Sequence, residues 1–225
     1  MLPIERRAWL AVAFVALVMS LLLFLPAGTF AYWQAWVYLV DYIGCSALIT
    51  QYLIKHDLAL LERRLSGGPG AEKEQAQRVA ILAASIAFIA LLVVPALDHR
   101  FGWSRVPVSV VVLSDILTAL CFYVVFLVFK ENTFTSATVE IAEDQRVISS
   151  GPYAYVRHPM YAGALPLCFA MPLALGSYWG LLGFLVMLPT LILRLLHEEK
   201  FLAVNLPGYI NYCTSVRWRL LPGIF

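Results

Sequence analysis

The sequence has few charged residues for its length. Of its 225 residues, 13% are Asp, Glu, Lys or Arg and 61% are hydrophobic, whereas soluble domains average about 25% charged residues. So few charges cannot coat the surface of a soluble domain, and an aromatic content of 13% excludes a disordered chain. The net charge of +2 is too small to indicate a nucleic-acid partner. The mean hydropathy of +0.80 instead indicates an integral membrane protein.

Motifs for metal sites and disulfide scaffolds are also missing. The four cysteines are dispersed along a long chain, which argues against a secreted disulfide framework. No HExxH or CxxC motif occurs, and the four histidines lie in loops or near the ends of apolar segments. The sequence therefore predicts no metal site. The glycine cluster in Ser66–Gly70 lacks a nucleotide-binding pattern and is interpreted as a flexible turn.

Long apolar segments predict an all-α protein, an integral membrane helical bundle with about six transmembrane segments. A spanning helix needs about 20 mostly apolar residues. Two shorter segments near the C-terminus are predicted to form a helical hairpin, which either spans the membrane or dips in and returns. Its helix could begin at Pro159, because proline favours the first helical position. The six segments are Ala8–Leu25, Tyr32–Ile54, Val79–Leu97, Val106–Phe129, Leu165–Leu175 and Trp179–Leu196.

Basic residues are distributed unevenly between the loops. Fourteen of the sixteen would lie on one side of this bundle, and only Arg100 and Arg105 on the other. The positive-inside rule therefore predicts that both termini are cytoplasmic, in the inner membrane if the protein is bacterial. An aromatic belt at the outer interface is predicted from Tyr32, Trp33 and Trp36.

The chain divides by composition into two parts. Residues 1–130 are predicted to be N-terminal transmembrane helices, and residues 131–225 a C-terminal region with the hairpin and a cytoplasmic tail. Two polar segments, Glu131–Arg157 and Lys200–Phe225, bracket the hairpin on the predicted cytoplasmic side. They are therefore expected to meet over its inner end.

Two carboxylates interrupt the apolar segments. Asp41 and Asp115 each lie inside a predicted span, and an intramembrane carboxylate is by default a candidate functional residue. No Lys or Arg accompanies them in those spans, so they do not form a proton-relay pattern. A structural role, with bonds to neighbouring hydroxyl groups, is the other interpretation.

The chemically densest segment is Gly151–Gly163, which reads GPYAYVRHPMYAG. Gly-Pro-Tyr sets a turn, and the following Arg157-His158-Pro159 opens a helix whose unpaired N–H groups and dipole favour an anion. The tyrosines of the segment offer faces for a purine or a cation. A simple juxtamembrane anchor would explain the arginine and a tyrosine, but not a proline directly after histidine at a helix start.

A second cluster lies at the end of the last apolar segment. Arg194 and Glu198 are four residues apart and share one helix face, and Glu199 follows directly. The two interpretations are an ordinary helix-end salt bridge and a functional site opposite the first cluster.

Together these residues resemble the isoprenylcysteine carboxyl methyltransferase family, including its bacterial and archaeal relatives, and more distantly the phospholipid N-methyltransferases. The resemblance covers residues 132–222, whereas the N-terminal spans match only as generic membrane helices. Its motifs are Gly151-Pro-Tyr, Arg157-His-Pro-Met-Tyr161, Gly163, Arg194, Glu198-Glu199, Pro207-Gly208-Tyr209, Tyr212 and Pro222.

The resemblance implies an S-adenosylmethionine-dependent methyltransferase with a cofactor pocket on the cytoplasmic side. A lipophilic or lipidated acceptor would enter from the membrane lipids, and its implied reacting group is a prenylcysteine-type carboxylate; thiol and amine acceptors stay open. The implied catalytic residues are Arg194 and Glu198, and the implied substrate contacts are Arg194 and Arg157. The implied cofactor contacts are Gln145, Arg146, Val147, Ile148, Tyr153, His158, Pro159, Met160, Tyr161 and Glu198.

Two other functions compete with this one. Sterol reductases, which use NADPH, carry a similar RHPNY motif, but Met160 and Ala162 stand where reductases usually have Asn and Phe. A non-enzymatic membrane scaffold would not explain why the two clusters contain these Arg, His, Tyr and Glu side chains.

Overall fold

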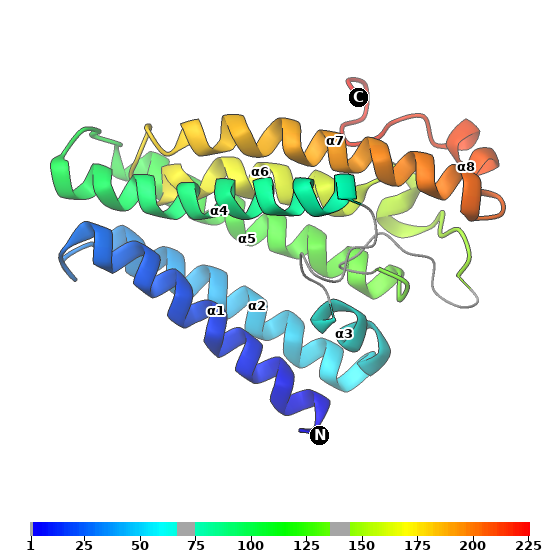
Figure 1. Ribbon diagram of the computed structural model, residues 1–225, viewed down its shortest axis with the longest axis horizontal. Helices are drawn as coiled ribbons and strands as arrows, with labels where there is room; N and C mark the ends of the chain where they lie inside the picture. The colour runs from blue at the N-terminus through cyan, green and yellow to red at the C-terminus, as the bar shows by residue number, and fades with distance from the viewer. Residues whose placement is uncertain (1, 67–74, 136–144) are drawn as a thin grey trace.

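The computed structural model describes residues 2–66, 75–135 and 145–225, and every regular element in these ranges is a helix (Figure 1). The prediction of an all-α bundle is confirmed. The elements are α1 (Ile4–Ala27), α2 (Trp33–His56), α3 (Leu58–Leu65), α4 (Gln75–Phe101), α5 (Val108–Glu131), the 3-10 helix η1 (Gly151–Ala154), α6 (Pro159–Ala174), α7 (Leu181–Asn205) and α8 (Tyr209–Ser215).

The described ranges contain five helices long and apolar enough to cross a membrane, namely α1, α2, α4, α5 and α7. The shorter α6 has 16 residues and pairs with α7 as the predicted hairpin. Proline occupies the first position of α6, as expected. Helix α7 runs well past the predicted end at Leu196, so Glu198 and Glu199 are helical.

Two short helices were not predicted. The segment after Lys55 was interpreted as a loop, but α3 forms there because Asp57 accepts a hydrogen bond from the Leu60 N–H at 2.8 Å. Leu60 and Leu61 are then buried under the bundle. Helix α8 follows Gly208, whose positive φ of 85° turns the chain after α7. The predicted glycine turn lies largely outside the described residues.

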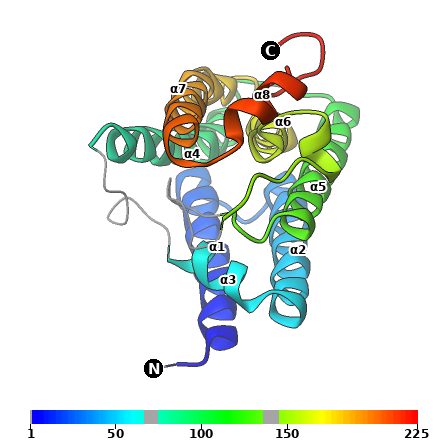
Figure 2. The same ribbon diagram turned by 90° about the vertical axis from the view of Figure 1, so that its right-hand side faces the viewer.

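The helices form one bundle that opens at one end (Figure 1). Helix α4 packs against α1 and α7, and α5 packs along α6. Toward the end where both termini lie, α1 and α2 diverge from the other helices, and α3 and α8 lie there (Figure 2). The main core draws on six helices, with Met19, Tyr38, Leu91, Cys121, Met171 and Met187 among its buried residues.

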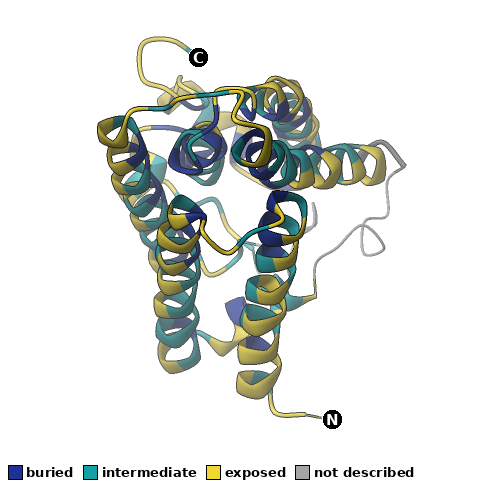
Figure 3. Cartoon of the chain, turned by 90° about the vertical axis from the view of Figure 1, so that its left-hand side faces the viewer, coloured by how far each residue is buried: buried dark blue, intermediate teal, exposed yellow. Residues whose placement is uncertain are grey.

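Exposed residues lie along the outer faces of the long helices (Figure 3), and many of them are large and apolar. Phe14, Val40 and Leu113 are each exposed by 65% or more. Outward apolar surface of this extent is typical of helices surrounded by lipid. Inside the bundle, Gly163 lets α6 approach α5 closely, because an added Cβ would lie 3.3 Å from the Cys121 carbonyl oxygen.

Trp33 and Trp36 are exposed, so both can take part in the predicted aromatic belt, whereas the prediction is wrong for Tyr32. The Tyr32 side chain is fully buried, its hydroxyl donates to the Leu175 carbonyl oxygen at 2.6 Å, and its ring stacks on His99. Tyr32 therefore joins α2 to the end of α6 instead of facing lipid.

A buried acid fastens the loops at the end of the bundle opposite the termini. Asp98 of α4 is 1% exposed and accepts hydrogen bonds from the Ser104 N–H and hydroxyl, both at 2.6 Å. It also accepts one from the Ser177 hydroxyl, which in turn accepts from the Gly180 N–H at 3.0 Å. One carboxylate thus ties the α4–α5 and α6–α7 connections together.

Candidate functional site

A cavity of about 460 Å³ lies at the end of the bundle that holds α3, α8 and the start of α6. Its size falls within the roughly 300–1,000 Å³ of small-molecule sites. All the residues predicted from the sequence as cofactor or substrate contacts line it: Gln145, Arg146, Val147, Ile148, Tyr153, Arg157, His158, Pro159, Met160, Tyr161, Arg194 and Glu198.

Residues 145–148 and the segment after α7 form part of the same wall, since Leu202, Leu206, Tyr209 and Tyr212 also line the cavity. The two polar segments that bracket the hairpin therefore meet at its end, as predicted. Asn132, at the end of α5, completes this side and donates to the Tyr153 hydroxyl at 2.9 Å.

Backbone hydrogen bonds hold the entry to α6 in place. The Arg157 N–H donates to the Trp218 carbonyl oxygen at 2.9 Å, and the His158 N–H donates to the Arg219 carbonyl oxygen at 3.0 Å. The C-terminal segment after α8 is thus paired with the two residues before Pro159. This pairing fixes where the first turn of α6, with its anion-favouring N–H groups, faces the cavity.

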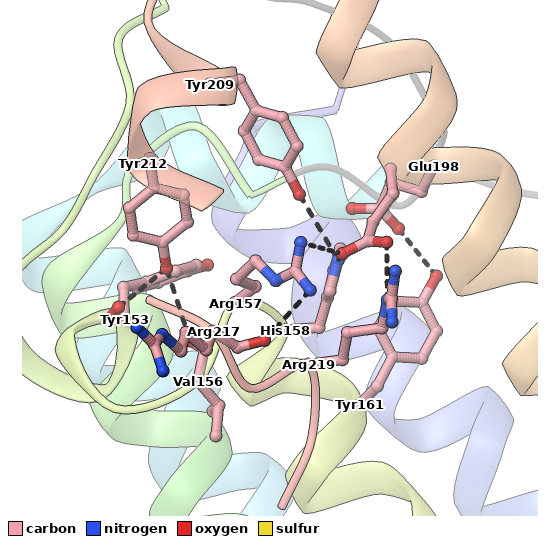
Figure 4. Close-up of polar contacts among 11 residues, drawn as sticks. Tyr153, Val156, Arg157, His158, Tyr161, Glu198, Tyr209, Tyr212, Arg217 and Arg219 are labelled. Carbon is pink, nitrogen blue, oxygen red and sulfur yellow. Dashed lines mark hydrogen bonds and ion pairs between the residues drawn. The ribbon is translucent and has the colours of Figure 1, made fainter. Parts of the chain in front are cut away.

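Tyrosine side chains form one wall of the cavity. The Tyr212 hydroxyl donates to the Tyr153 carbonyl oxygen at 2.7 Å, and the Tyr209 hydroxyl lies 3.5 Å from His158 Nε2 (Figure 4). Burial raises the pKa of Tyr153, Tyr209 and Tyr212 above the usual value for a phenol. All three therefore stay neutral hydroxyl donors at physiological pH, with aromatic faces beside the cavity.

Glu199 is the centre of a buried ionic cluster. Arg157 Nη1 lies 3.0 Å from its carboxylate, Arg219 Nε lies 2.7 Å from it and His158 Nε2 lies 3.4 Å from it. The side chains of Glu199 and Arg157 are only 11% and 10% exposed. Arg157 also donates to the Arg217 carbonyl oxygen at 3.2 Å. The cluster therefore locks α6, α7 and the C-terminal segment to one another.

Glu198 faces a different partner on the cavity side. The Tyr161 hydroxyl of α6 donates to Glu198 Oε2 at 2.8 Å and also interacts with the Arg194 side chain. Glu198, Tyr161 and Arg194 all line the cavity, whereas Glu199 does not. The structure thus brings the predicted pair, Arg194 and Glu198, to one wall of the site through Tyr161.

Arg64 of α3 is a cavity residue that sequence reasoning missed. Its guanidinium lies 5.3 Å from the centre of the Phe129 ring, and it borders the cavity together with Ile81 and Ala84 of α4. Burial and the nearby Arg194 lower the pKa of Arg64. One sequence signal could have indicated this position: Asp57 is a typical N-cap residue, and it predicts a short helix that contains Arg64.

The charge of the cavity wall is mainly positive. Its described lining includes the arginines Arg64, Arg146, Arg157 and Arg194, and among these residues Glu198 is the single carboxylate. Such a wall favours a ligand that carries an anionic group. Among the residues that the structure describes, no group of three or more His, Cys, Asp or Glu side chains could hold a metal ion.

The residues that line the cavity fit S-adenosylmethionine. Tyrosine faces suit an adenine ring or a sulfonium, Glu198 suits hydroxyl or ammonium donors, and the first turn of α6 suits a carboxylate. The apolar wall formed by Ile81, Ala84 and Leu191 suits the lipophilic part of an acceptor.

Comparison with known families agrees with this chemistry. Residues 109–206 match the model of the phospholipid methyltransferase family. The matched range contains α5, η1, α6 and α7, and therefore most of the predicted site residues. The match supports a membrane methyltransferase in general. A search of curated proteins found no matching protein.

Proposed function

We propose that this protein is an S-adenosylmethionine-dependent methyltransferase that methylates a lipophilic acceptor, with a prenylcysteine-type carboxylate as the favoured acceptor. The observation that carries this proposal is the single cavity that gathers Arg157–Tyr161, Arg194 and Glu198 beside an apolar wall. The family match supports the reaction class. The positive cavity wall supports an anionic acceptor.

In this proposal the chain acts mainly by positioning. The cofactor supplies a methyl group on a sulfonium, and an acceptor that is already anionic needs no proton removed. Arg194 would hold both oxygens of the acceptor carboxylate, and Glu198 with the α6 N-terminus would orient the cofactor. The tyrosine wall and the C-terminal segment would exclude water, so that alignment and electrostatics supply most of the rate.

We also propose that this cavity lies on the cytoplasmic side. Support comes from the basic residues: the connections at the end that holds both termini carry most of them. The cytoplasm is also the compartment that supplies the cofactor.

A phospholipid amine is the second candidate acceptor, because residues 109–206 match a family named for phospholipid methylation. Purified protein in lipid nanodiscs, given methyl-labelled S-adenosylmethionine, distinguishes the two. One arm contains farnesylcysteine with a free carboxylate, and its matched control contains the methyl ester. The other arm contains phosphatidylethanolamine, with phosphatidylcholine as its control.

The expected result is label on farnesylcysteine and none on its ester. Label on phosphatidylethanolamine alone would mean that the acceptor is a phospholipid amine, and the protein would still be a methyltransferase. Saturable binding of NADPH without binding of S-adenosylmethionine would overturn the reaction class in favour of a reductase.

A further inference from the structure

Arg64 is a charged cavity residue that lies outside the motifs identified in the sequence. It belongs to α3, which lies at the same end of the bundle as α8 but on the side of α1 and α2 (Figure 2). Arg64 nevertheless lines the cavity together with Tyr161 of α6 and Arg194 of α7. The family match covers residues 109–206 and does not include it, so its role has to be inferred from its contacts.

Contacts on two sides hold α3 against α5. Leu60 and Leu61 of α3 pack in a buried apolar cluster that includes Phe129 of α5. Arg63 Nη2 donates to the carbonyl and hydroxyl oxygens of Thr133, which lies two residues after the end of α5. The position of α3, and of the side chains that it carries, is therefore set by the same helix that leads into the cavity-lining segment.

The guanidinium of Arg64 is close enough to that of Arg194 for the two charges to interact. It lies 5.3 Å from the centre of the Phe129 ring, a contact that restricts where the side chain points. It interacts electrostatically with Arg194 and with Tyr161, whose hydroxyl also interacts with Arg194. Two positive charges from separate parts of the chain thus act on one region of the cavity. Like charges repel each other, and an anion bound between them would offset that repulsion.

We propose that Arg64 binds the carboxylate of the lipophilic acceptor together with Arg194, an inference that rests on the proposed function. The oxygens of a carboxylate offer about four lone-pair positions, so one carboxylate can accept hydrogen bonds from two guanidinium groups. A guanidinium has N–H donors and no acceptor, so it cannot accept a hydrogen bond from the N–H groups of an amine. The pair therefore selects an acceptor whose reacting group is anionic.

The reaction removes the charge that Arg64 would bind. Methylation converts the anionic carboxylate to a neutral ester, as one of its oxygens forms a bond to the methyl carbon and the electron pair of the broken methyl–sulfur bond stays on sulfur. The ester still has oxygen acceptors, but the hydrogen bonds that it accepts are no longer assisted by its charge. Arg64 therefore favours binding of the acid and release of the ester.

Equilibrium binding of farnesylcysteine and of its methyl ester to the purified protein in nanodiscs tests this role, with empty nanodiscs as the reference for partition into lipid. We expect the unsubstituted protein to bind the acid at least tenfold more tightly than the ester. Arg64→Gln, which keeps a planar polar group without the charge, should lower the affinity for the acid roughly tenfold. Its affinities for the ester and for S-adenosylmethionine should stay nearly unchanged. Arg64→Lys, which keeps the charge, should retain part of the preference for the acid.

The matched control is Lys200→Gln. It removes a positive charge from an exposed position of α7 that is not among the described residues lining the cavity, and it should leave the preference for the acid unchanged. An equal loss in Lys200→Gln would overturn the proposal, because only the overall charge would then matter. A parallel fall in acid and ester affinity in Arg64→Gln would overturn it as well, since Arg64 would then have a structural role.

Two further outcomes would contradict the proposal without depending on the fold of a variant. One is equal binding of acid and ester by the unsubstituted protein. The other is tighter binding of lysophosphatidylethanolamine than of farnesylcysteine, which would assign the arginines to a phosphate. The proposed function fails separately: if the preference for the acid depends on Arg64 but farnesylcysteine receives no methyl group, the reaction is wrong and the carboxylate-binding role of Arg64 is supported.

Discussion

Glu198 and Glu199 are consecutive residues of α7, yet their carboxylates are bound by different groups. Tyr161 donates to Glu198 at 2.8 Å on the cavity wall, whereas Arg157, His158 and Arg219 surround Glu199 beside it. Successive helix residues point about 100° apart, so one helix end presents one acid to the cavity and one to the ionic cluster.

Substitution of Glu199 should destabilise the protein. Glu199→Ala leaves Arg157 buried without its counterion, and breaking a buried ion pair costs about 3–5 kcal/mol. We expect a clearly lower melting temperature for purified Glu199→Ala, with Glu198→Ala as the matched control that lowers it far less. Equal losses in the two variants would contradict the separate roles.

Arg194 and Glu198 should act on different ligands. Arg194→Lys replaces a bidentate guanidinium by a point charge, so turnover at saturating cofactor should fall roughly tenfold or more while cofactor affinity stays nearly intact. Glu198→Gln should mainly weaken cofactor binding. Calorimetry and turnover on both variants check this. If both change only the melting temperature, the residues are structural.

Substitutions at the start of α6 should weaken cofactor binding. His158→Ala and Tyr161→Phe each remove a polar group from the cavity wall, and the expected loss in S-adenosylmethionine affinity is roughly tenfold. Tyr155→Phe is the matched control, because Tyr155 belongs to the same motif but is 72% exposed and does not border the cavity. Unchanged affinity in the first two variants would remove them from the binding site.

Cysteine labelling should report which end of the bundle is cytoplasmic. Phe30→Cys and Tyr178→Cys, at exposed positions of one end, should react with a membrane-impermeant maleimide from outside intact cells or spheroplasts. Ile210→Cys, exposed near the cavity, should react only after permeabilisation. The unsubstituted protein, with its own four cysteines, gives the background. Labelling of Ile210→Cys from outside would reverse the orientation.

Asp98 should matter for stability and not for binding. Asp98→Ala removes the acceptor of three hydrogen bonds, and each hydrogen bond to a charged group contributes about 1.5–3 kcal/mol. The melting temperature should fall, while cofactor affinity of the remaining folded protein stays unchanged because the site lies at the other end of the bundle. A loss of affinity in folded Asp98→Ala would show that the two ends are coupled.

Much of the fold followed from residue type alone, because lipid-facing helices must be long and apolar. The predicted segments all form helices, and the stretch Arg157–Tyr161 of the motif borders one cavity together with the Arg194–Glu198 pair. Local composition did not predict the role of a residue where that role depends on the direction in which its side chain points. Tyr32 has the composition of an interfacial anchor, but its side chain points inward to Leu175.

Partners distant in sequence could not be predicted. Glu199 is paired with Arg219 because the C-terminal segment folds back to the residues just before α6, and the residues near Glu199 give no indication of that path. Arg64 reaches the cavity because α3 turns under the bundle, a consequence of the Asp57 cap and of burial of Leu60. Both contacts depend on tertiary geometry. The periodicity of apolar residues predicts helices, but it does not predict which distant residues come together.

The backbone pairing of Trp218 and Arg219 with Arg157 and His158 sets an order of assembly during biosynthesis. Helix α6 and its neighbours emerge from the ribosome before Trp218 and Arg219 are made, so the apolar helices can insert while the site is still incomplete. The residues that enter α6 are then held in place by a segment that is synthesised after α7. A nonsense codon just before Trp218 would leave the membrane helices in place and remove the backbone partners that hold Arg157 and His158 beside the cavity.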